Sequence, residues 1–222
     1  MADAKITALT EDTAPQPTDI LATVDDPAGT PVTKKAQIAN LPLSNGLLNW
    51  VSGVYYTGQG GATEEEGTNA ITADILYALP IKIPNTGDVT ADRISIDVTS
   101  AAGGGSLARL GIYQNSNGVP GALLLDAGTV AVDGTGAQEA SISQVLSADK
   151  WYWLALVSDS TPTLRSSLNA RLNASYMGYT RPNLPLKITG YTVSHSFAAL
   201  PDPFGSGTAD TGVFPLIFLR SA

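Results

Sequence analysis

Short alternations of apolar and polar residues, separated by Gly, Asn, Asp and Pro, run through residues 92–159. This pattern is typical of an antiparallel all-β domain, because alternate side chains of a strand face the core and the solvent. It predicts five strands at near-regular spacing. These are Arg93–Ser100, Leu107–Gln114, Leu123–Val132, Ala137–Leu146 and Trp151–Ser158.

The residues on either side of this block predict shorter and less regular elements. Pro80 and Pro84 exclude a long helix, and proline is tolerated at a sheet edge, so we expect one or two edge strands in Ile71–Ile83. Leu164–Leu172 has weak helical spacing, and the rest of residues 160–190 predicts a long loop. Further strands are predicted at Tyr55–Thr57, Tyr191–Phe197 and Val213–Leu219, and loops at Gly58–Asn69 and Phe204–Thr211.

The first 46 residues differ from the rest of the chain. Pro15 and Pro17 favour an extended leader. The turn signal Asp26–Gly29 then separates two segments with strand propensity, Asp19–Val24 and Val32–Ile38, which predicts a small hairpin. An isolated hairpin is marginal in water. We therefore expect this arm to pack on its own domain, on a sister subunit or on a larger assembly.

Five short sequence segments follow one another in this arm, and four different segments follow farther along the chain. The arm blocks are Ile6–Thr10, Thr13–Pro15, Thr18–Asp25, Thr33–Lys35 and Ile38–Leu41. Their order resembles the N-terminal segment of tailed-bacteriophage virion proteins, where it precedes tail-fibre, tail-tip, head-fibre and decoration proteins. The downstream pattern is similar to the β-sandwich domains of such proteins, and it consists of Leu110–Tyr113, Gly118–Gly121, Leu125–Gly128 and Trp151–Ala155.

The resemblance implies a virion structural role, with the chain made in the bacterial host cytoplasm. It implies attachment to other virion proteins through residues 1–46 and a homotrimeric state. The residues expected to anchor the arm are Ile20, Leu21, Val24, Lys34, Lys35 and Ile38. The resemblance does not distinguish a location on the virion head from one on the tail.

Composition narrows the alternatives. The 222 residues carry a net charge of −8, which argues against binding a nucleic-acid backbone. There is no cysteine, so disulfides, zinc–thiolate sites and cysteine nucleophiles are excluded. The first residues lack the apolar run of a signal peptide, and no segment is long and apolar enough to predict membrane insertion. Nothing in the sequence calls for a cofactor.

A catalytic interpretation finds little support. His195 is the only histidine, and the adjacent Ser194 and Ser196 would point away from its face of a strand. Glycoside hydrolysis needs two carboxylates across a groove. The candidates are Asp74, Asp97, Asp126, Asp133, Glu139 and Asp159, and most of them fall at predicted strand ends or turns, where Asp usually caps the backbone. We expect no enzymatic activity.

Binding sites for ions or sugars are the remaining candidates. Glu64–Glu66 and the pair Asp88 and Asp92 offer oxygen ligands suited to calcium, but they lack the alternating spacing that wraps one ion, so a solvated acidic loop is favoured. Trp151 and Trp153 share a strand face and are expected in the core. Tyr176, Tyr179 and Arg181 lie in a polar segment, and they are the candidates for contact with a glycan or a protein partner.

These observations together predict an all-β chain. We expect an arm at residues 1–46, a linker at 47–54 and a jelly-roll-like antiparallel β-sandwich at 55–222. The leading function is a non-enzymatic fibre or decoration subunit whose sandwich faces the host surface. The alternative is a carbohydrate-binding adsorption protein of the tail, with a glycan hydrolase ranked last.

Overall fold

The computed structural model describes residues 20–25, 32–37, 50–58, 66–84, 87–167 and 188–222. The chain divides into two units, Met1–Asn45 and Gly46–Ala222, and each is described by itself. All regular structure in the described part is β-strand, as expected. The strands are β1 (Ile20–Asp25), β2 (Val32–Gln37), β3 (Tyr55–Thr57), β4 (Glu66–Ala70), β5 (Ile75–Lys82), β6 (Val89–Ser100), β7 (Leu107–Ser116), β8 (Val119–Ala131), β9 (Gly136–Leu146), β10 (Trp151–Ser158), β11 (Thr163–Ser167), β12 (Gly190–Ser194), β13 (Thr208–Asp210), β14 (Phe214–Pro215) and β15 (Phe218–Ser221).

The first unit contains a two-stranded antiparallel sheet formed by β1 and β2. Its register sets Ile20 opposite Gln37 and Asp25 opposite Val32. The predicted hairpin is confirmed, because both strands end within one residue of their predicted limits. The proline-containing leader and Ile38 lie outside the described residues.

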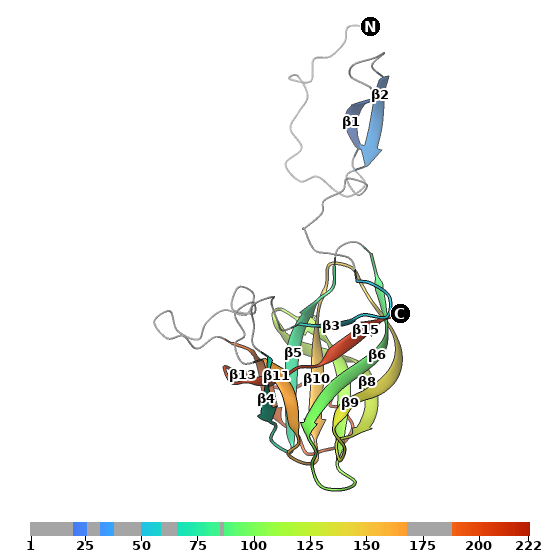
Figure 1. Cartoon of the computed structure of the whole chain (residues 1–222). Helices are drawn as coiled ribbons and strands as arrows, with labels where there is room; N and C mark the ends of the chain where they lie inside the picture. Colours follow the sequence, from blue (N-terminus) through green and yellow to red (C-terminus); the bar gives the residue numbers. More distant parts are fainter. Residues whose placement is uncertain (1–19, 26–31, 38–49, 59–65, 85–86, 168–187) are drawn as a thin grey trace. The chain divides into compact units, whose positions relative to one another are not determined.

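The second unit is a sandwich of two antiparallel sheets, which confirms the expected fold class (Figure 1). Its six-stranded sheet has the order β13-β12-β5-β10-β7-β8. β10 lies inside this sheet, with β5 on one side and β7 on the other. Trp151 is partly buried, and every other residue of β10 is buried. A strand that is apolar on both sides, as this one is, must be covered on both faces.

The other sheet is organised by β6. β9 pairs with β6 along one side, from Val89 opposite Leu146 to Val98 opposite Gly136. On the other side, β15 pairs with the first half of β6 and β11 with its end. The short strands β3, β4 and β14 complete this sheet of seven, with β3 next to β15 and the other two next to β11.

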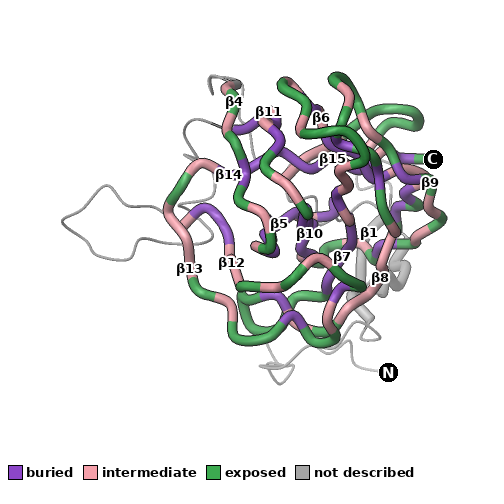
Figure 2. The backbone as a smooth tube through the Cα atoms, turned by 90° about the horizontal axis from the view of Figure 1, so that it is seen from below, coloured by how far each residue is buried: buried purple, intermediate pink, exposed green. Residues whose placement is uncertain are grey.

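The main core lies between the two sheets. It takes alternate residues from each strand, for example Ile94, Ile96 and Val98 of β6, all at most 1% exposed. Leu110 and Ile112 of β7 contribute from the opposite sheet. Figure 2 shows the buried stretches along β7 and β10, whereas β8 is mostly intermediate or exposed.

A second apolar cluster covers the outer face of the six-stranded sheet. It contains Leu76, Ala78, Tyr113, Trp153, Ala155 and Val157 from the sheet, and Leu200 and Phe204 from the segment that crosses it. We call residues 195–207 the strap. The strap is bonded to β8 at three points, because Phe204 N donates to Gly121 O, Leu123 N donates to the Asp202 carboxylate and Leu200 N donates to the Asp126 carboxylate. The strap explains why β10 is buried on both faces.

The edge position expected for Ile71–Ile83 is wrong for half of the strand. β5 has β10 on one side and β12 on the other, where β12 pairs with Ile75–Ala78. Pro80 lies beyond the part that β12 covers, so its missing N–H removes no bond to β12. Proline thus marks a partial edge within a strand that is otherwise interior.

Four other local expectations are also wrong. The described part of Leu164–Leu172 is a strand, in which Leu164 and Ser166 are buried and Arg165 between them is not, a period of two rather than a helical one. The loop expected at Phe204–Thr211 contains β13, and that expected at Gly58–Asn69 contains β4. The predicted last strand is divided into β14 and β15, since Leu216 donates its N–H to Arg165 O between them.

Residues 50–54, which the sequence assigns to a linker, pack on the sandwich. The Trp50 ring stacks on Tyr56 with centroids 4.4 Å apart. Gly53 N donates to Ser221 O at 2.8 Å, and Ser221 N donates to Val54 O at 3.1 Å. The start and the end of the second unit are therefore bonded to each other.

Candidate functional site

Two arginines stand opposite each other on the outer face of the seven-stranded sheet. Arg220 of β15 is in register with Arg93 of β6. Their neighbours Leu219 and Ile94 are fully buried, so the alternation of the strands sends both arginines outward. Like charges directly opposite in a sheet are destabilising, and this pair therefore needs compensation.

Two carboxylates supply that compensation. Asp92 accepts hydrogen bonds from Arg220 Nε at 2.8 Å and from Nη2 at 2.5 Å, a bidentate pair. Its main-chain oxygen accepts a further bond from Arg93 Nη1 at 2.8 Å. Glu139 Oε2 of β9 lies 3.9 Å from Arg93 Nε. A β-bulge at Asp92 leaves this residue without a register partner on β9, which frees its side chain to meet Arg220.

Tyr55 crosses this charged group from the opposite edge of the sheet. Its hydroxyl donates to a Glu139 carboxylate oxygen. β3 and β9 are separated by β15 and β6, and three strand spacings amount to about 14 Å. Both side chains must therefore lie extended along the sheet. The Arg220 guanidinium lies 5.8 Å from the Tyr55 ring centroid, and Ser95, which is in register with Glu139, is only 4% exposed.

We call Tyr55, Asp92, Arg93, Glu139 and Arg220 the Tyr55 platform. Two guanidinium groups, two carboxylates and one aromatic ring, contributed by four strands, are joined in one network. Its formal charge is zero. A third ion pair lies farther along the same sheet, where Arg165 Nε donates to Asp97 at 2.7 Å.

The network changes the proton affinity of its members. The hydrogen bonds from Arg220 hold the pKa of Asp92 below its usual value, and the same contact raises the pKa of Arg220. The hydrogen bond to Glu139 is the main cause of a raised pKa at Tyr55. Each shift favours the ionisation state in which the network is drawn together.

We expect acid to weaken the sandwich through Asp92. Its folded pKa lies below its unfolded value of about 3.9, so the pairing stabilises the fold above that pH and is lost as the pH falls through the folded pKa. Asp149, whose pKa Lys82 lowers, acts with the same sign. Calorimetry between pH 7 and pH 2 should therefore show a steeper fall in melting temperature for the wild type than for Asp92→Asn. Parallel curves would contradict the assignment.

The carboxylates considered for hydrolysis are engaged in the fold. Asp126 is the most connected, because it accepts from Arg109 Nη1 at 2.7 Å, Gly128 N at 3.0 Å and Leu200 N at 3.1 Å. The others accept as follows: Asp74 from Phe197 N, Asp97 from Arg165, Asp133 from Gly105 N, Glu139 from Tyr55 and Asp159 from Leu107 N. Each has a structural partner, as Asp in turns usually does.

His195 and the acidic residues also have local partners. His195 Nε2 lies 3.1 Å from Ala199 O within the strap. Asp88 accepts from Ala148 N at 2.8 Å. Among the described residues, no three His, Asp or Glu side chains are grouped so as to hold a metal ion. Glu64 and Glu65 lie outside the described residues.

The core position predicted for Trp153 is confirmed. Trp153 is 1% exposed, its Nε1 donates to Asn115 Oδ1 at 3.0 Å, and its ring meets Tyr191 edge to face. Trp151 is only partly buried, and Lys82 Nζ lies 5.9 Å from its ring centroid. Tyr176, Tyr179 and Arg181, the predicted contact residues, lie outside the described residues.

The residues predicted to anchor the arm, apart from Ile38, lie in the two strands of the hairpin, and each is paired through its backbone with a residue outside the predicted set. Leu21 is opposite Ala36, Val24 is opposite Thr33, and Lys34 and Lys35 are opposite Thr23 and Ala22. Ile38 lies outside the described residues. Their role as an anchor stays a prediction.

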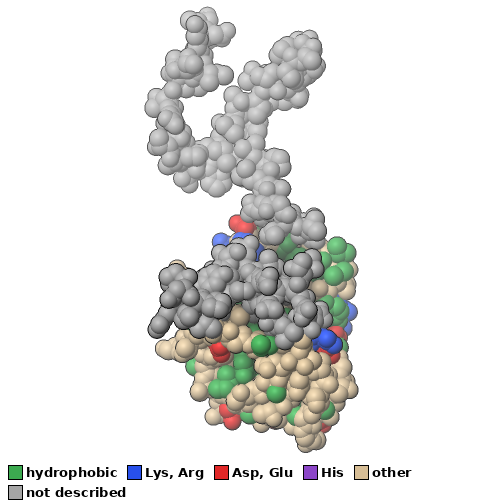
Figure 3. Space-filling model, turned by 60° about the vertical axis from the view of Figure 1, so that its left-hand side comes forward, with side chains coloured by type: hydrophobic (Ala, Val, Ile, Leu, Met, Phe, Trp, Pro, Cys, Tyr) green, Lys and Arg blue, Asp and Glu red, His purple; other side chains and the backbone are tan. Residues whose placement is uncertain are grey.

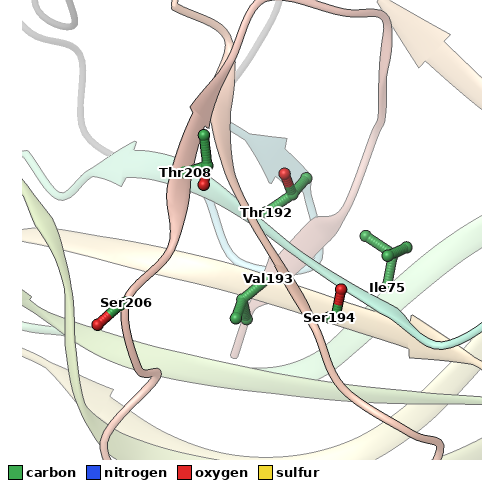
Figure 4. A pocket seen from close by; sticks show the side chains of 6 residues that line it. All are labelled: Ile75, Thr192, Val193, Ser194, Ser206 and Thr208. Carbon is green, nitrogen blue, oxygen red and sulfur yellow. The ribbon is translucent and has the colours of Figure 1, made fainter.

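A hollow of about 350 Å³ lies beside β12 and β13. It is lined by Ile75, Thr192, Val193, Ser194, Ser206 and Thr208. Figure 4 shows Thr192 and Ser194 on one side of β12 and Val193 on the other. No charged side chain lines it, so it offers hydroxyl groups but no group that would fix an ionic ligand.

Charged side chains are sparse on the face of the molecule seen in Figure 3. Basic and acidic groups among the described residues are scattered there between neutral ones. A nucleic-acid backbone is bound by clustered Lys and Arg, and the described residues visible on this face form no such cluster.

No protein-family model matches the sequence, and no curated protein matches it. A solved structure of the cysteine protease and lectin-like domains of Cwp84, a surface layer associated protein of Clostridium difficile, matches with 13% identity and a TM-score of 0.37. The match covers 66% of this chain and 32% of that one. No helix long and apolar enough for a membrane span occurs among the described residues.

Sequence reasoning missed the Tyr55 platform. The alternation of Arg93, Ser95 and Asp97 with buried isoleucines and valine marks the outer face of β6, and this signal was available. The pairing of Asp92 with Arg220 spans 128 residues. Only the sheet order brings such distant positions together, and that order cannot be read from local patterns in the sequence.

Proposed function

We propose that the chain is a non-enzymatic structural subunit of a tailed-bacteriophage virion, a fibre or decoration protein attached through residues 1–46. One observation carries the proposal. Among the described residues, β1 and β2 pair only with each other, in a unit separate from the sandwich. A lone two-stranded sheet has little stability of its own, so binding to a partner protein would stabilise it. The resemblance of the arm blocks to virion proteins supports the same partner.

The sandwich is in turn suited to act as the outward domain. Its chain start and end are bonded together, and its carboxylates serve the fold rather than facing each other across a groove. This arrangement favours a structural or binding role over hydrolysis. Homotrimeric assembly and location on the virion belong to the same proposal and rest on the resemblance.

Deleting residues 1–45 should abolish attachment without unfolding the sandwich. We expect a soluble fragment with a cooperative thermal transition, because Trp50 and the β3–β15 ladder remain. The measurement is occupancy in purified particles, by quantitative mass spectrometry, after complementing a virion that lacks the chain. The full chain, produced in parallel, is the control. Full occupancy of the deleted form would refute the anchor, and an insoluble fragment would show that the arm belongs to the sandwich.

A carbohydrate-binding adsorption protein is the second candidate. The observation that favours it is the partly exposed Tyr55 platform, which combines an aromatic ring with planar polar groups. The two candidates are compatible, because one concerns attachment and the other concerns what the sandwich contacts.

A further inference from the structure

The Tyr55 ring is both exposed and held in place. It is 39% exposed although its hydroxyl is bonded to Glu139 and Arg220 lies against its ring. The Arg220 guanidinium lies over the ring, so the exposed area of Tyr55 belongs to the surface that Arg220 does not cover. A ring fixed in this way loses little conformational freedom when something stacks on it.

The polar groups around the ring are arranged to recognise hydroxyl groups. Arg93 has five N–H donors and Glu139 has about four lone-pair sites. Within this network, Arg93 donates to Asp92 O and lies near Glu139, and Glu139 accepts from Tyr55. Donors and acceptors therefore remain beside the ring. Two positive and two negative groups cancel, so the platform does not select an anion such as phosphate.

We propose that the Tyr55 platform binds a neutral sugar residue. The apolar face of the sugar ring would stack on Tyr55, while its hydroxyl groups would bond to Arg93 and Glu139. This inference deepens the proposed host-facing role of the sandwich. Only the natural source of the sugar depends on that role. The alternative is a purely structural role, in which Tyr55 stabilises the short edge strand β3 on the sheet.

A protein partner suits the platform less well. Tyr and Arg are common at protein interfaces, but Asp and Glu are depleted there, and this platform places two carboxylates, Asp92 and Glu139, beside its ring. Val51 and Val54 are exposed nearby in the chain, at 59% and 43%. A second copy of the chain covering this face is therefore a distinct outcome of the test below.

The test uses the full chain and a panel of neutral mono- and oligosaccharides. Array binding would select the best sugar, and titration calorimetry would measure its affinity. Tyr55→Ala should bind it about tenfold more weakly, because it loses the stacked ring. Tyr55→Phe, which keeps the ring, should lose less. An unchanged affinity of Tyr55→Ala would overturn the proposal, as would the absence of wild-type binding to every sugar at millimolar concentration.

A blocking variant separates binding from folding. Ser141 is exposed on β9 opposite Arg93, so Ser141→Trp covers the platform without removing any of its bonds. It should abolish sugar binding at an unchanged melting temperature. Gln114→Trp, an exposed position on the other sheet, is the matched control and should bind normally. Normal binding by Ser141→Trp would overturn the proposal. So would a Ser141→Trp variant that lowers the oligomeric state while the wild type binds no sugar, because a second copy would then occupy this face.

The outcomes for the arm and for the platform are independent. A chain that lacks residues 1–45 should still bind the sugar, because the platform lies wholly within residues 55–220. A chain with Ser141→Trp should still enter the particle. If Ser141→Trp loses sugar binding but still occupies the particle normally, attachment through the arm is unaffected and sugar recognition belongs to the platform.

Discussion

Replacing Trp153 with alanine should lower the free energy of unfolding by about 3–5 kcal/mol. The side chain is 1% exposed in the cluster beneath the strap, and its ring meets Tyr191. Removing it creates a cavity and leaves Asn115 Oδ1 without its Nε1 donor. Urea unfolding, followed by tyrosine fluorescence or circular dichroism, measures the loss.

Trp151→Ala is the matched control for this variant. Trp151 lies in the same strand but is only partly buried beside Lys82, so its truncation should cost clearly less. Equal losses for the two variants would contradict the description of the second cluster. A Trp153→Ala variant of unchanged stability that no longer binds cells or glycans would reverse the assignment from core to binding site.

Gly111→Ala should destabilise the sandwich by about 1–3 kcal/mol by forcing the strap away from the sheet. A Cβ at Gly111 would lie 2.2 Å from Leu200 Cδ1 and 2.6 Å from Leu125 O. The side chain of Leu200 can move, but the main chain of β8 cannot move without breaking its ladder with β7. Hydrogen exchange should show faster exchange at Leu200 and Phe204, whose N–H groups bond to Asp126 and Gly121.

Gly134→Ala provides the comparison, since a Cβ there has no heavy atom within 4 Å. Its thermal transition and its exchange pattern should match those of the wild type. If Gly111→Ala also matched the wild type, the strap would not be packed against β7 as described.

The central strands could be predicted because their information is local. Each of the five strands expected between residues 93 and 158 is present, and Trp151–Ser158 has the predicted limits. Alternation of side chains and turn residues such as Asn117–Gly118, both at positive φ, is readable within a few positions. The hairpin of the arm was predictable for the same reason.

The remaining elements depend on partners far along the chain. β11 is a strand because β4 and β6 flank it, although the sequence of Leu164–Leu172, which overlaps it, has weak helical spacing. Pro80 suggested an edge, and only the end point of β12 shows that half of β5 is interior. Tertiary pairing decides such cases, since strand propensity depends strongly on context.

The candidate site was less predictable than the fold. Glu139 is recognisable from the sequence as a candidate carboxylate and Asp92 as a candidate calcium ligand, but no local pattern connects either of them with an arginine. Tyr55 was expected only as part of a first strand. The network requires β3, β6, β9 and β15 to lie side by side, and no short motif encodes that arrangement.

The bonding of β3 to β15 determines how the second unit would respond to mechanical load. A pull transmitted along the chain from the arm reaches the sandwich at Trp50 and then at β3, a strand of only three residues. The ring stack on Tyr56, the bond from Gly53 N to Ser221 O and the bond from Tyr55 to Glu139 would carry that force in turn. A load applied to the second unit from residues before Trp50 would therefore act on this corner of the sandwich before it reached the core.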